Sequence, residues 1–296
     1  MSLNKRLMSS APPAFVASEN FKVVTYTGND GTQNIDVGFK PDLVWIKNRN
    51  NSSDSTHDHS LFDSQRGTYR VRANSEGAAN DYASHYGGIT DNGFQVKNGL
   101  ALNDADGTYV AWCWKANGGT TSTNTDGANI DSTVQVNANA GFSIVKFTGT
   151  GNAAHTVGHG LGATPDVILL KDTSNTRNWM MHISSAPSAN QPFGGNLDLN
   201  NAFNTNSGTN GGFGTPTSSV ITFTNGASNV INVNANNANI IAYCFKSIDG
   251  FSKIGAYVGN GSATGPIVET GFEPAFVLGR KVSGDNWWLL DNKSNT

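Results

Sequence analysis

Tyr109-Val-Ala-Trp-Cys-Trp-Lys115 and Ile240-Ile-Ala-Tyr-Cys-Phe-Lys246 are two copies of one pattern, and the fold prediction rests on them. In each copy apolar residues occupy both alternating faces, as expected for a central β-strand that is covered on both sides. Both copies contain Ala, an aromatic residue, Cys, a second aromatic residue and Lys in the same order. The pattern predicts a duplicated unit in which Cys113 and Cys244 hold equivalent positions, buried apart as free thiols.

Two further landmarks precede each copy, and both occur a third time near the end of the sequence. The first is a strand pattern that opens with Phe and stops at Gly, in Phe21–Gly28, Phe142–Gly149 and, more loosely, Phe251–Gly259. The second is Gly-x-x-Pro followed by an apolar run, in Gly38–Lys47, Gly162–Lys171 and Gly271–Arg280. From the opening Phe to the Pro the offsets are 20, 23 and 23 residues (41−21, 165−142, 274−251). A Pro in front of an apolar run fixes the strand entry, where its missing N–H does no harm.

These landmarks divide the chain into parts of domain size or smaller. We expect an N-terminal arm (1–20), a first repeat (21–117), a Gly-, Ser- and Thr-rich linker (118–132), a second repeat (133–249) and the first half of a third repeat (250–296). Thr133–Asn137 alternates cleanly and is a candidate leading strand of the second repeat. The third repeat lacks a closing strand, so either the natural chain continues past Thr296 or a partner completes the fold. The first of these is favoured.

Composition supports an all-β fold. The chain contains 34 Gly, and only 14% of its 296 residues are charged. No window sustains helical apolar spacing, and Gly disfavours helix. Six Trp and fifteen Phe require packed cores. We therefore predict tandem β-sandwiches of jelly-roll or lectin-like type with an extended N-terminal arm. In that arm Pro12, Pro13 and Phe15 are candidate contacts for docking onto a neighbouring subunit, and a disordered leader is the alternative.

Charge and hydropathy exclude several function classes. The net charge is −3 and no basic run is present, so the sequence offers no means of neutralising nucleic-acid phosphates. Met1–Arg6 has no apolar segment behind it, so we expect no signal peptide. The apolar runs are too short to cross a bilayer. We expect neither nucleic-acid binding nor membrane insertion.

Four segments carry residue types found in ligand or catalytic sites. Thr56-His-Asp-His-Ser60 could supply metal ligands, although a solvated loop fits better because a site needs three or four convergent groups. Gly158-His-Gly-Leu-Gly162 faintly resembles a phosphate cradle, but a strand follows it and a tight turn is favoured. Asn103-Asp-Ala-Asp-Gly107 could hold calcium, yet it lacks the closing Glu of a calcium loop. Asp63 and Arg66 are expected to form a structural turn, because no second carboxylate recurs beside them. We predict no metal, no cofactor and no catalytic residue.

As a set, these landmarks resemble a repeat domain of unassigned function found in virion proteins of marine podoviruses and cyanophages. In the first repeat the resemblance rests on Phe21–Gly28, Gly38–Asn48, Phe62–Gly67, Asn92–Val96 and Ala111–Ala116. In the second it rests on Gly141–Gly149 and Thr156–Gly162, and it covers nearly everything from Phe21 onward. The second repeat departs by lacking Asp-Ser-x-Arg-Gly and by a long Asn- and Gly-rich insertion around Asn200–Gly214. This departure puts any shared ligand function in doubt.

The resemblance implies a non-enzymatic structural protein of a phage particle. We expect a tail-associated fibre or fibre-like protein, assembled in the host cytoplasm, that oligomerises, contacts other virion proteins and attaches to a host-surface glycan or protein. A head or neck decoration protein is one alternative. The other is a carbohydrate-binding module, in which Trp179, Trp287 and Trp288 would stack on sugars, although Trp at strand positions is usually buried. The position in the particle, the stoichiometry and the receptor are not encoded in recognisable motifs.

Overall fold

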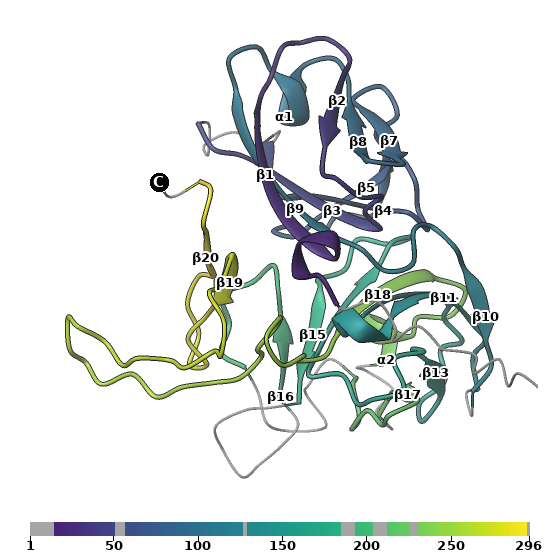
Figure 1. The fold of residues 1–296 in the computed structure, drawn as a ribbon. Coiled ribbons are helices and arrows are strands. Elements are labelled where there is room, and N and C mark those ends of the chain that lie inside the picture. The colour runs from purple at the N-terminus through teal and green to yellow at the C-terminus, as the bar shows by residue number, and fades with distance from the viewer. Residues whose placement is uncertain are drawn as a thin grey trace, which may run out of the picture.

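The regular secondary structure is almost entirely antiparallel β-sheet, which confirms the all-β prediction (Figure 1). The computed structural model describes residues 15–50, 57–126, 129–184, 193–203, 212–224 and 230–294. In these ranges helix is confined to single turns, which include α1 (Leu100–Asn103) and α2 (Val230–Val233). No helix in these ranges is long and apolar enough to cross a membrane.

The first half of the chain forms one large sheet and one small sheet. The large sheet has the order β1-β9-β3-β4-β5-β6, and the small sheet has the order β2-β8-β7. The strands are β1 (Phe21–Thr27), β2 (Gln33–Asp36), β3 (Leu43–Asn48), β4 (Ser60–Asp63), β5 (Tyr69–Arg72), β6 (Asn80–Asp81), β7 (Tyr86–Thr90), β8 (Gly93–Val96) and β9 (Thr108–Trp114). The predicted closing strand β9 lies between β1 and β3, which confirms its central position.

The second half repeats this arrangement with small differences. Its large sheet has the order β10-β11-β12-β18-β14-β15-β16, and its small sheet pairs β13 with β17. The strands are β10 (Ser122–Asn124), β11 (Ser132–Asn137), β12 (Phe142–Thr148), β13 (Thr156–Gly158), β14 (Val167–Asp172), β15 (Met180–Ile183), β16 (Phe193–Asn196), β17 (Val220–Thr222) and β18 (Asn239–Phe245). The expected leading strand is present as β11, which pairs with β12.

The register of the two large sheets is the same. In the first sheet Cys113 lies opposite Val44 of β3, and in the second Cys244 lies opposite Ile168 of β14. Both cysteines are buried free thiols, as expected. Burial raises the pKa of both thiols, that of Cys244 to about 12, so neither is a nucleophile near neutral pH.

The two large sheets pack against each other through a shared core. Side chains from the inner face of the first sheet, including Leu43, Leu61 and Trp112, join one buried cluster with Ile144 and Tyr243 of the second. The prediction of two sandwiches separated by a linker did not anticipate this contact. It arises because each central strand is apolar on both faces, so each large sheet has a second face to bury.

The outer faces are covered by the small sheets. Cys113, Val44 and Phe62 belong to a cluster with the residues of β2, β8 and α1. Cys244 and Ile168 belong to the corresponding cluster in the second half. Four β-layers therefore alternate with three apolar layers, and the shared core lies in the middle (Figure 1).

The segment 118–132 is not a bare linker. Ser122–Asn124 form β10, which pairs with β11 at the edge of the second large sheet. The Asp42 carboxylate accepts hydrogen bonds from the backbone N–H groups of Gly118 (2.9 Å) and Gly119 (2.6 Å). These contacts fix the start of the segment against the first sheet, so its composition alone was a poor guide to its conformation.

Residues 250–294 contain a single hairpin, β19 (Phe276–Gly279) and β20 (Trp288–Asp291). Phe276 and Leu289 pack from this hairpin against the shared core. The segment Phe251–Gly259 forms no strand, although its sequence resembles β1 and β12. The hairpin lies beside the two large sheets, at the left in Figure 1.

Only the last part of the expected N-terminal arm is described. Pro12 and Pro13 lie outside the described residues. Phe15 packs edge-on against Phe251, with ring centroids 5.0 Å apart, and a short 3-10 turn (Ala17–Glu19) follows it. The backbone carbonyl of Asn20 accepts a hydrogen bond from the Lys115 N–H at 2.9 Å. Residues 15–20 thus contact their own chain.

Candidate functional site

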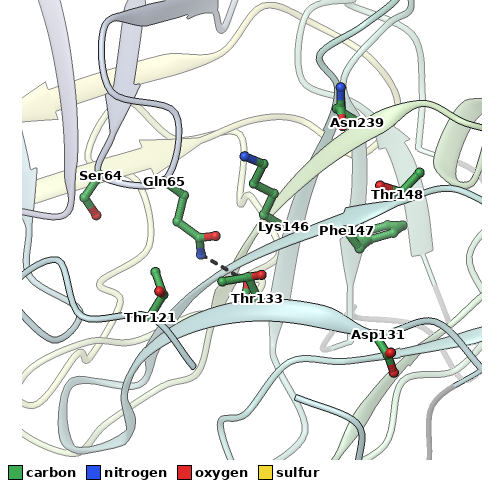
Figure 2. Close-up of a pocket in the computed structure, with 9 residues that line it drawn as sticks. All are labelled: Ser64, Gln65, Thr121, Asp131, Thr133, Lys146, Phe147, Thr148 and Asn239. Atoms are coloured by element: carbon green, nitrogen blue, oxygen red, sulfur yellow. Dashed lines mark hydrogen bonds between the residues drawn. The ribbon is translucent and has the colours of Figure 1, made fainter. Parts of the chain in front are cut away.

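A polar recess of about 410 Å³ lies where the first half of the chain meets the second (Figure 2). Its walls come from the turn after β4, from residues around β10 and β11, from β12 and from the start of β18. The lining residues are Ser64, Gln65, Thr121, Asp131, Thr133, Lys146, Phe147, Thr148 and Asn239.

The turn 63–67 places Ser64 and Gln65 at one wall. Asp63 ends β4, and its Oδ1 accepts hydrogen bonds from the backbone N–H groups of Gln65 (3.0 Å) and Arg66 (2.9 Å). Gly67 then takes a positive φ of 65°, which few other residues adopt without strain. This geometry confirms the predicted Asp-capped turn.

The same turn docks onto the second half. The side-chain amide of Gln65 donates to the backbone carbonyls of Thr133 (3.2 Å) and Ile144 (2.9 Å), and the first of these bonds is drawn in Figure 2. The Ser64 hydroxyl donates to Gln135 Oε1 at 2.6 Å. The wall of the recess is therefore also a contact between the two halves.

The lining of the recess is mostly polar, and Phe147 is its one aromatic residue. Lys146 and Thr148 alternate along β12 with Phe147, whose ring packs on Phe223 in the opposite layer. Thr133 lies opposite Lys146, and Asn239 lies opposite Thr148. Beside Phe147, the lining offers hydroxyls, amides, one amine and one carboxylate, a set that can bind a polar ligand through hydrogen bonds. Hydrolysis of a glycosidic bond uses a pair of carboxylates, and the recess contains Asp131 alone.

Below the turn, a buried ionic network joins the halves. The Asp63 Oδ2 atom accepts from Arg66 Nε at 2.6 Å and from the Tyr243 hydroxyl at 2.7 Å. The Asp63 side chain is fully buried and that of Arg66 is 5% exposed. Burial alone would lower the pKa of Arg66, but the interactions with Asp63 and Tyr243 together outweigh burial and raise that pKa. Burial raises the pKa of the Tyr243 hydroxyl well above its ordinary value. The Asp63 carboxylate, the Arg66 guanidinium and the Tyr243 hydroxyl thus bond one another across the contact between the halves, an arrangement suited to packing.

The His-Asp-His loop does not form a metal site. His57 Nε2 lies 2.7 Å from Asp104 Oδ2, whereas His59 Nδ1 accepts from Trp45 Nε1 at 3.0 Å. The two rings therefore serve different partners, and no group of metal-ligating side chains converges within the described residues. His57 is buried and His59 is half-buried, which corrects the expectation of a solvated loop for residues 57–59. Burial, with a smaller effect of Lys47, lowers the pKa of His59 to about 4.

Gly158–Gly162 forms the expected tight turn. Gly160 and Gly162 have positive φ angles of 74° and 69°, and the buried His159 accepts through Nδ1 from the Leu161 N–H. The following element is strand β14, so no helix N-terminus is available to bind a phosphate.

Asn103–Gly107 also serves the fold. The Asn103 side chain bonds Asn29 and Gly31, and Asp104 contacts His57. The Asp30 carboxylate accepts from the Ala105 N–H at 3.1 Å. The side chains of Asn103, Asp104 and Asp30 are thus engaged in contacts within the protein, and these contacts hold the turn in place.

The three candidate sugar-stacking Trp residues have different environments. Trp179 is completely buried and donates to the Arg72 carbonyl at 2.7 Å, so the prediction for this residue is wrong. Trp287 is partly buried and packs on Phe203, with ring centroids 5.9 Å apart. Trp288 is 68% exposed. Of the three, Trp288 alone presents a free aromatic face, and it lies on the hairpin far from the recess in sequence.

Sequence reasoning missed Lys171, a buried amine that also joins the halves. Its Nζ donates to the backbone carbonyls of Glu76 (3.0 Å), Asp172 (2.9 Å) and Arg177 (2.7 Å). Burial lowers the pKa of Lys171 to about 8. The signal was present in the second landmark, whose three copies all end in a basic residue, at Lys47, Lys171 and Arg280. Lys47 and Arg280 likewise donate to backbone carbonyls.

Comparison with known proteins places the chain in a family without an assigned role. Residues 16–296 match a domain of unknown function (DUF7483), and the chain belongs to that family. No curated protein and no solved structure matches the chain. The matched range includes both large sheets and the β19–β20 hairpin, which agrees with the shared core that unites them.

Proposed function

We propose that this family member is a non-enzymatic structural protein of a bacteriophage particle, a tail-associated fibre or fibre-like component that acts in particle assembly and host attachment. It is assembled in the host cytoplasm and resides in the virion. Its partners are other virion proteins, further copies of itself and a glycan or protein of the host surface. A head or neck decoration protein is the alternative placement.

The observation that carries the structural role is the use of the polar side chains. Asp63, Arg66 and Tyr243 form a buried network between the halves, and Gln65 bonds the backbone of β11 and β12. Residues that would be candidates for catalysis are thereby committed to packing. We interpret the two halves as tandem β-sandwich repeats fused through a common core, an arrangement that gives a rigid module for displaying loops.

The phage assignment rests on the resemblance of the landmark motifs and is tested by locating the chain in a particle. Electron cryo-microscopy of the virion is expected to show density for both large sheets on the tail. Deleting residues 1–20 is expected to abolish incorporation while the circular dichroism spectrum shows that the purified protein is still folded. Normal incorporation of the truncated protein would defeat the anchoring role of the arm, and absence of the chain from purified particles would defeat the proposal.

Carbohydrate binding without catalysis is a second candidate, favoured by the hydroxyl- and amide-rich lining of the recess. A glycan array followed by titration of any hit tests it. Lys146→Ala should weaken binding about tenfold if the amine contacts the ligand, because a charged hydrogen bond contributes about 1.5 kcal/mol. The matched control is Lys253→Ala, at an exposed lysine outside the recess. Turnover of any polysaccharide would contradict the non-enzymatic assignment.

A further inference from the structure

Strand β1 forms one edge of the first large sheet, and it is the longest edge strand in the described residues (Figure 1). It has seven residues, whereas the other edge strands of the large sheets, β6, β10 and β16, have two, three and four. Its register with β9 runs from Phe21 to Thr27 without a bulge. Proteins usually shorten, bulge or cover such edges, because the free N–H and C=O groups readily pair with another strand.

The corresponding edge in the second half is covered. Strand β12 is the counterpart of β1, and β11 pairs with it along residues 142–147. Val145 and Phe147 of β12 are buried, whereas Val24 and Tyr26, which hold the same places in β1, are only partly buried. Within the described residues β1 pairs with β9 alone, so it has no counterpart of β11.

The hydrogen bonds at the two ends of β1 show which main-chain groups face the open edge. The Gly28 N–H donates to the Gly107 carbonyl at 2.8 Å, and the Lys115 N–H donates to the Asn20 carbonyl at 2.9 Å. Because alternate residues of an antiparallel strand bond the same neighbour, the even-numbered residues of β1 bond β9. The outward N–H and C=O groups therefore belong to the odd-numbered residues, Phe21, Val23, Thr25 and Thr27.

The preceding segment of the same chain is poorly suited to cover this edge. Counted by the offset of 121 residues between β1 and β12 (142 − 21), Pro12 corresponds to Thr133, whose main chain faces β12 by the same alternation. A proline has no N–H to donate to a neighbouring strand. Phe15 packs on Phe251, and a 3-10 turn separates it from β1.

The sequence of β1 fits an antiparallel copy of itself. When a two-fold axis passes beside Val24, all seven residues pair, with Val23 opposite Thr25 and Lys22 opposite Tyr26 of the second copy. The odd-numbered residues then face one another, as a hydrogen-bonded ladder requires. No like charges lie opposite, and Val–Val and Val–Thr pairs suit antiparallel sheets. The lysine ammonium is also placed to lie over the tyrosine ring.

We propose that β1 is an interface strand through which two copies of this chain join their first large sheets into one continuous antiparallel sheet. The contact is isologous, with the strand order β9-β1-β1-β9 across the two-fold axis. It rests on the self-association included in the proposed function and gives that association a surface. It forms in the purified protein without other components of a particle, so it is tested separately from the placement of the chain in a virion.

Sedimentation velocity over a range of protein concentrations is expected to show a monomer–dimer equilibrium. Amide hydrogen exchange of Val23 and Thr25, measured by NMR, should slow as the concentration rises. The amides of Val24 and Tyr26, which bond β9, should exchange slowly at every concentration and serve as internal controls. A protein that stays monomeric at all concentrations would overturn the proposal. So would protection of Val23 and Thr25 in the monomer that is lost on deleting residues 1–14, since the chain's own segment would then be the occupant.

Thr25→Pro removes an outward N–H and leaves the bonds between β1 and β9 in place. It should weaken dimerisation about thirtyfold, since one main-chain hydrogen bond is lost on each side of the axis. The matched control is Thr123→Pro, at an exposed threonine of edge strand β10 whose N–H also faces outward by the same alternation. It should change the dissociation constant of the dimer less than about twofold.

Thr25→Glu keeps every main-chain donor and places two carboxylates near each other across the axis. It should also weaken dimerisation, and added salt should restore part of the loss. This variant separates the interface from any effect of proline on folding. Equal dissociation constants for Thr25→Pro and Thr123→Pro, or a dimer in which the Val23 and Thr25 amides stay unprotected, would show that the copies meet through another surface and would overturn the proposal.

Discussion

The sheet β1-β9-β3-β4 and the sheet β12-β18-β14-β15 have the same strand order and register, yet several equivalent positions differ in chemistry. Leu43 lies opposite Asp63, and its counterpart Val167 lies opposite Ile183. The central strands differ as well, with Trp112 in β9 where β18 has Tyr243. The Asp63 carboxylate of the first sheet therefore accepts a hydrogen bond from the Tyr243 hydroxyl of the second.

This difference teaches how two similar sheets recognise each other. Two identical apolar faces could stack in several registers, because apolar contact has little directional preference. An acceptor on the first sheet and a donor on the second fix one arrangement. We infer that the Asp63, Arg66 and Tyr243 network determines which faces meet and how, while the apolar core supplies most of the stabilisation.

The largest expected effect is the loss of the buried carboxylate. Asp63→Ala leaves the Arg66 guanidinium buried without its counter-ion, which should lower the free energy of unfolding by about 3–5 kcal/mol in urea denaturation. The matched control is Asp291→Ala on β20, which caps a similar turn through Lys293 and Ser294 without a buried arginine. It should cost about 1 kcal/mol. Equal losses in the two variants would show that the turn, and not the ion pair, is the source.

Acidification should destabilise the second sheet more than the first at one equivalent position, because the second sheet has His182 where the first has Phe62. Burial lowers the pKa of His182 to about 4, below its unfolded value of about 6.5. Between these values the unfolded state binds more protons, so stability falls as the pH drops from about 6.5 to 4. His182→Leu, which introduces the residue of the equivalent Leu290, should remove on the order of 2 kcal/mol of this loss, measured by urea denaturation at pH 7.5 and 4.5.

Beside His159, whose pKa burial lowers, His59 should contribute to the acid sensitivity that remains in the His182→Leu protein. Its pKa is also lowered to about 4, by burial and by Lys47. An unchanged slope of stability against pH in the His182→Leu protein would contradict the assignment.

The Tyr243 hydroxyl should contribute less to the free energy of unfolding than the Asp63 carboxylate does. Tyr243→Phe removes its bonds to Asp63 (2.7 Å) and Arg66 (3.1 Å), and hydrogen bonds to charged groups stabilise by about 2 kcal/mol. Tyr26→Phe is the control, since the Tyr26 hydroxyl donates to the neutral Leu102 carbonyl at 2.7 Å. It should cost about 1 kcal/mol in the same denaturation experiment. A greater loss in Tyr26→Phe would argue against a special role for the network.

The smallest expected difference is that between the labelling rates of the two thiols, Cys113 and Cys244. Cys113 and Cys244 occupy equivalent buried positions, and burial raises both pKa values. An aromatic disulfide reagent should label both at the rate of global unfolding in the native protein and within seconds in urea. Single Cys→Ala variants separate the two signals. Rapid labelling of one thiol in the native state would show that its half of the chain opens on its own.

Much of the fold follows from local patterns in the sequence. The alternation in Tyr109–Lys115 and Ile240–Lys246 gave the central strands, and the Gly-x-x-Pro landmark gave the starts of β3, β14 and β19. These features are local because a strand presents successive side chains to opposite faces whatever its neighbours are. The linker at 118–132 was predicted less well, since its contact with Asp42 depends on residues far away in the sequence.

The contacts between the two halves could not be predicted from local sequence patterns. Tyr243 bonds a carboxylate on another sheet, and nothing near Tyr243 in the sequence indicates that partner. The recess is likewise assembled from both halves, from Ser64 to Asn239. One indication was available: β3 and β9 are apolar on both faces, which implies two covering layers, and the first repeat supplies only one.

The shared core also has a consequence for the separability of the protein. Each half, expressed alone, would present its inner apolar face to water, and it should be insoluble or self-associate. Supplied together as two polypeptides, divided between Asp126 and Asn129, the halves should reassemble as a split protein. The two halves therefore depend on each other for solubility, although each has its own sheets and its own outer core.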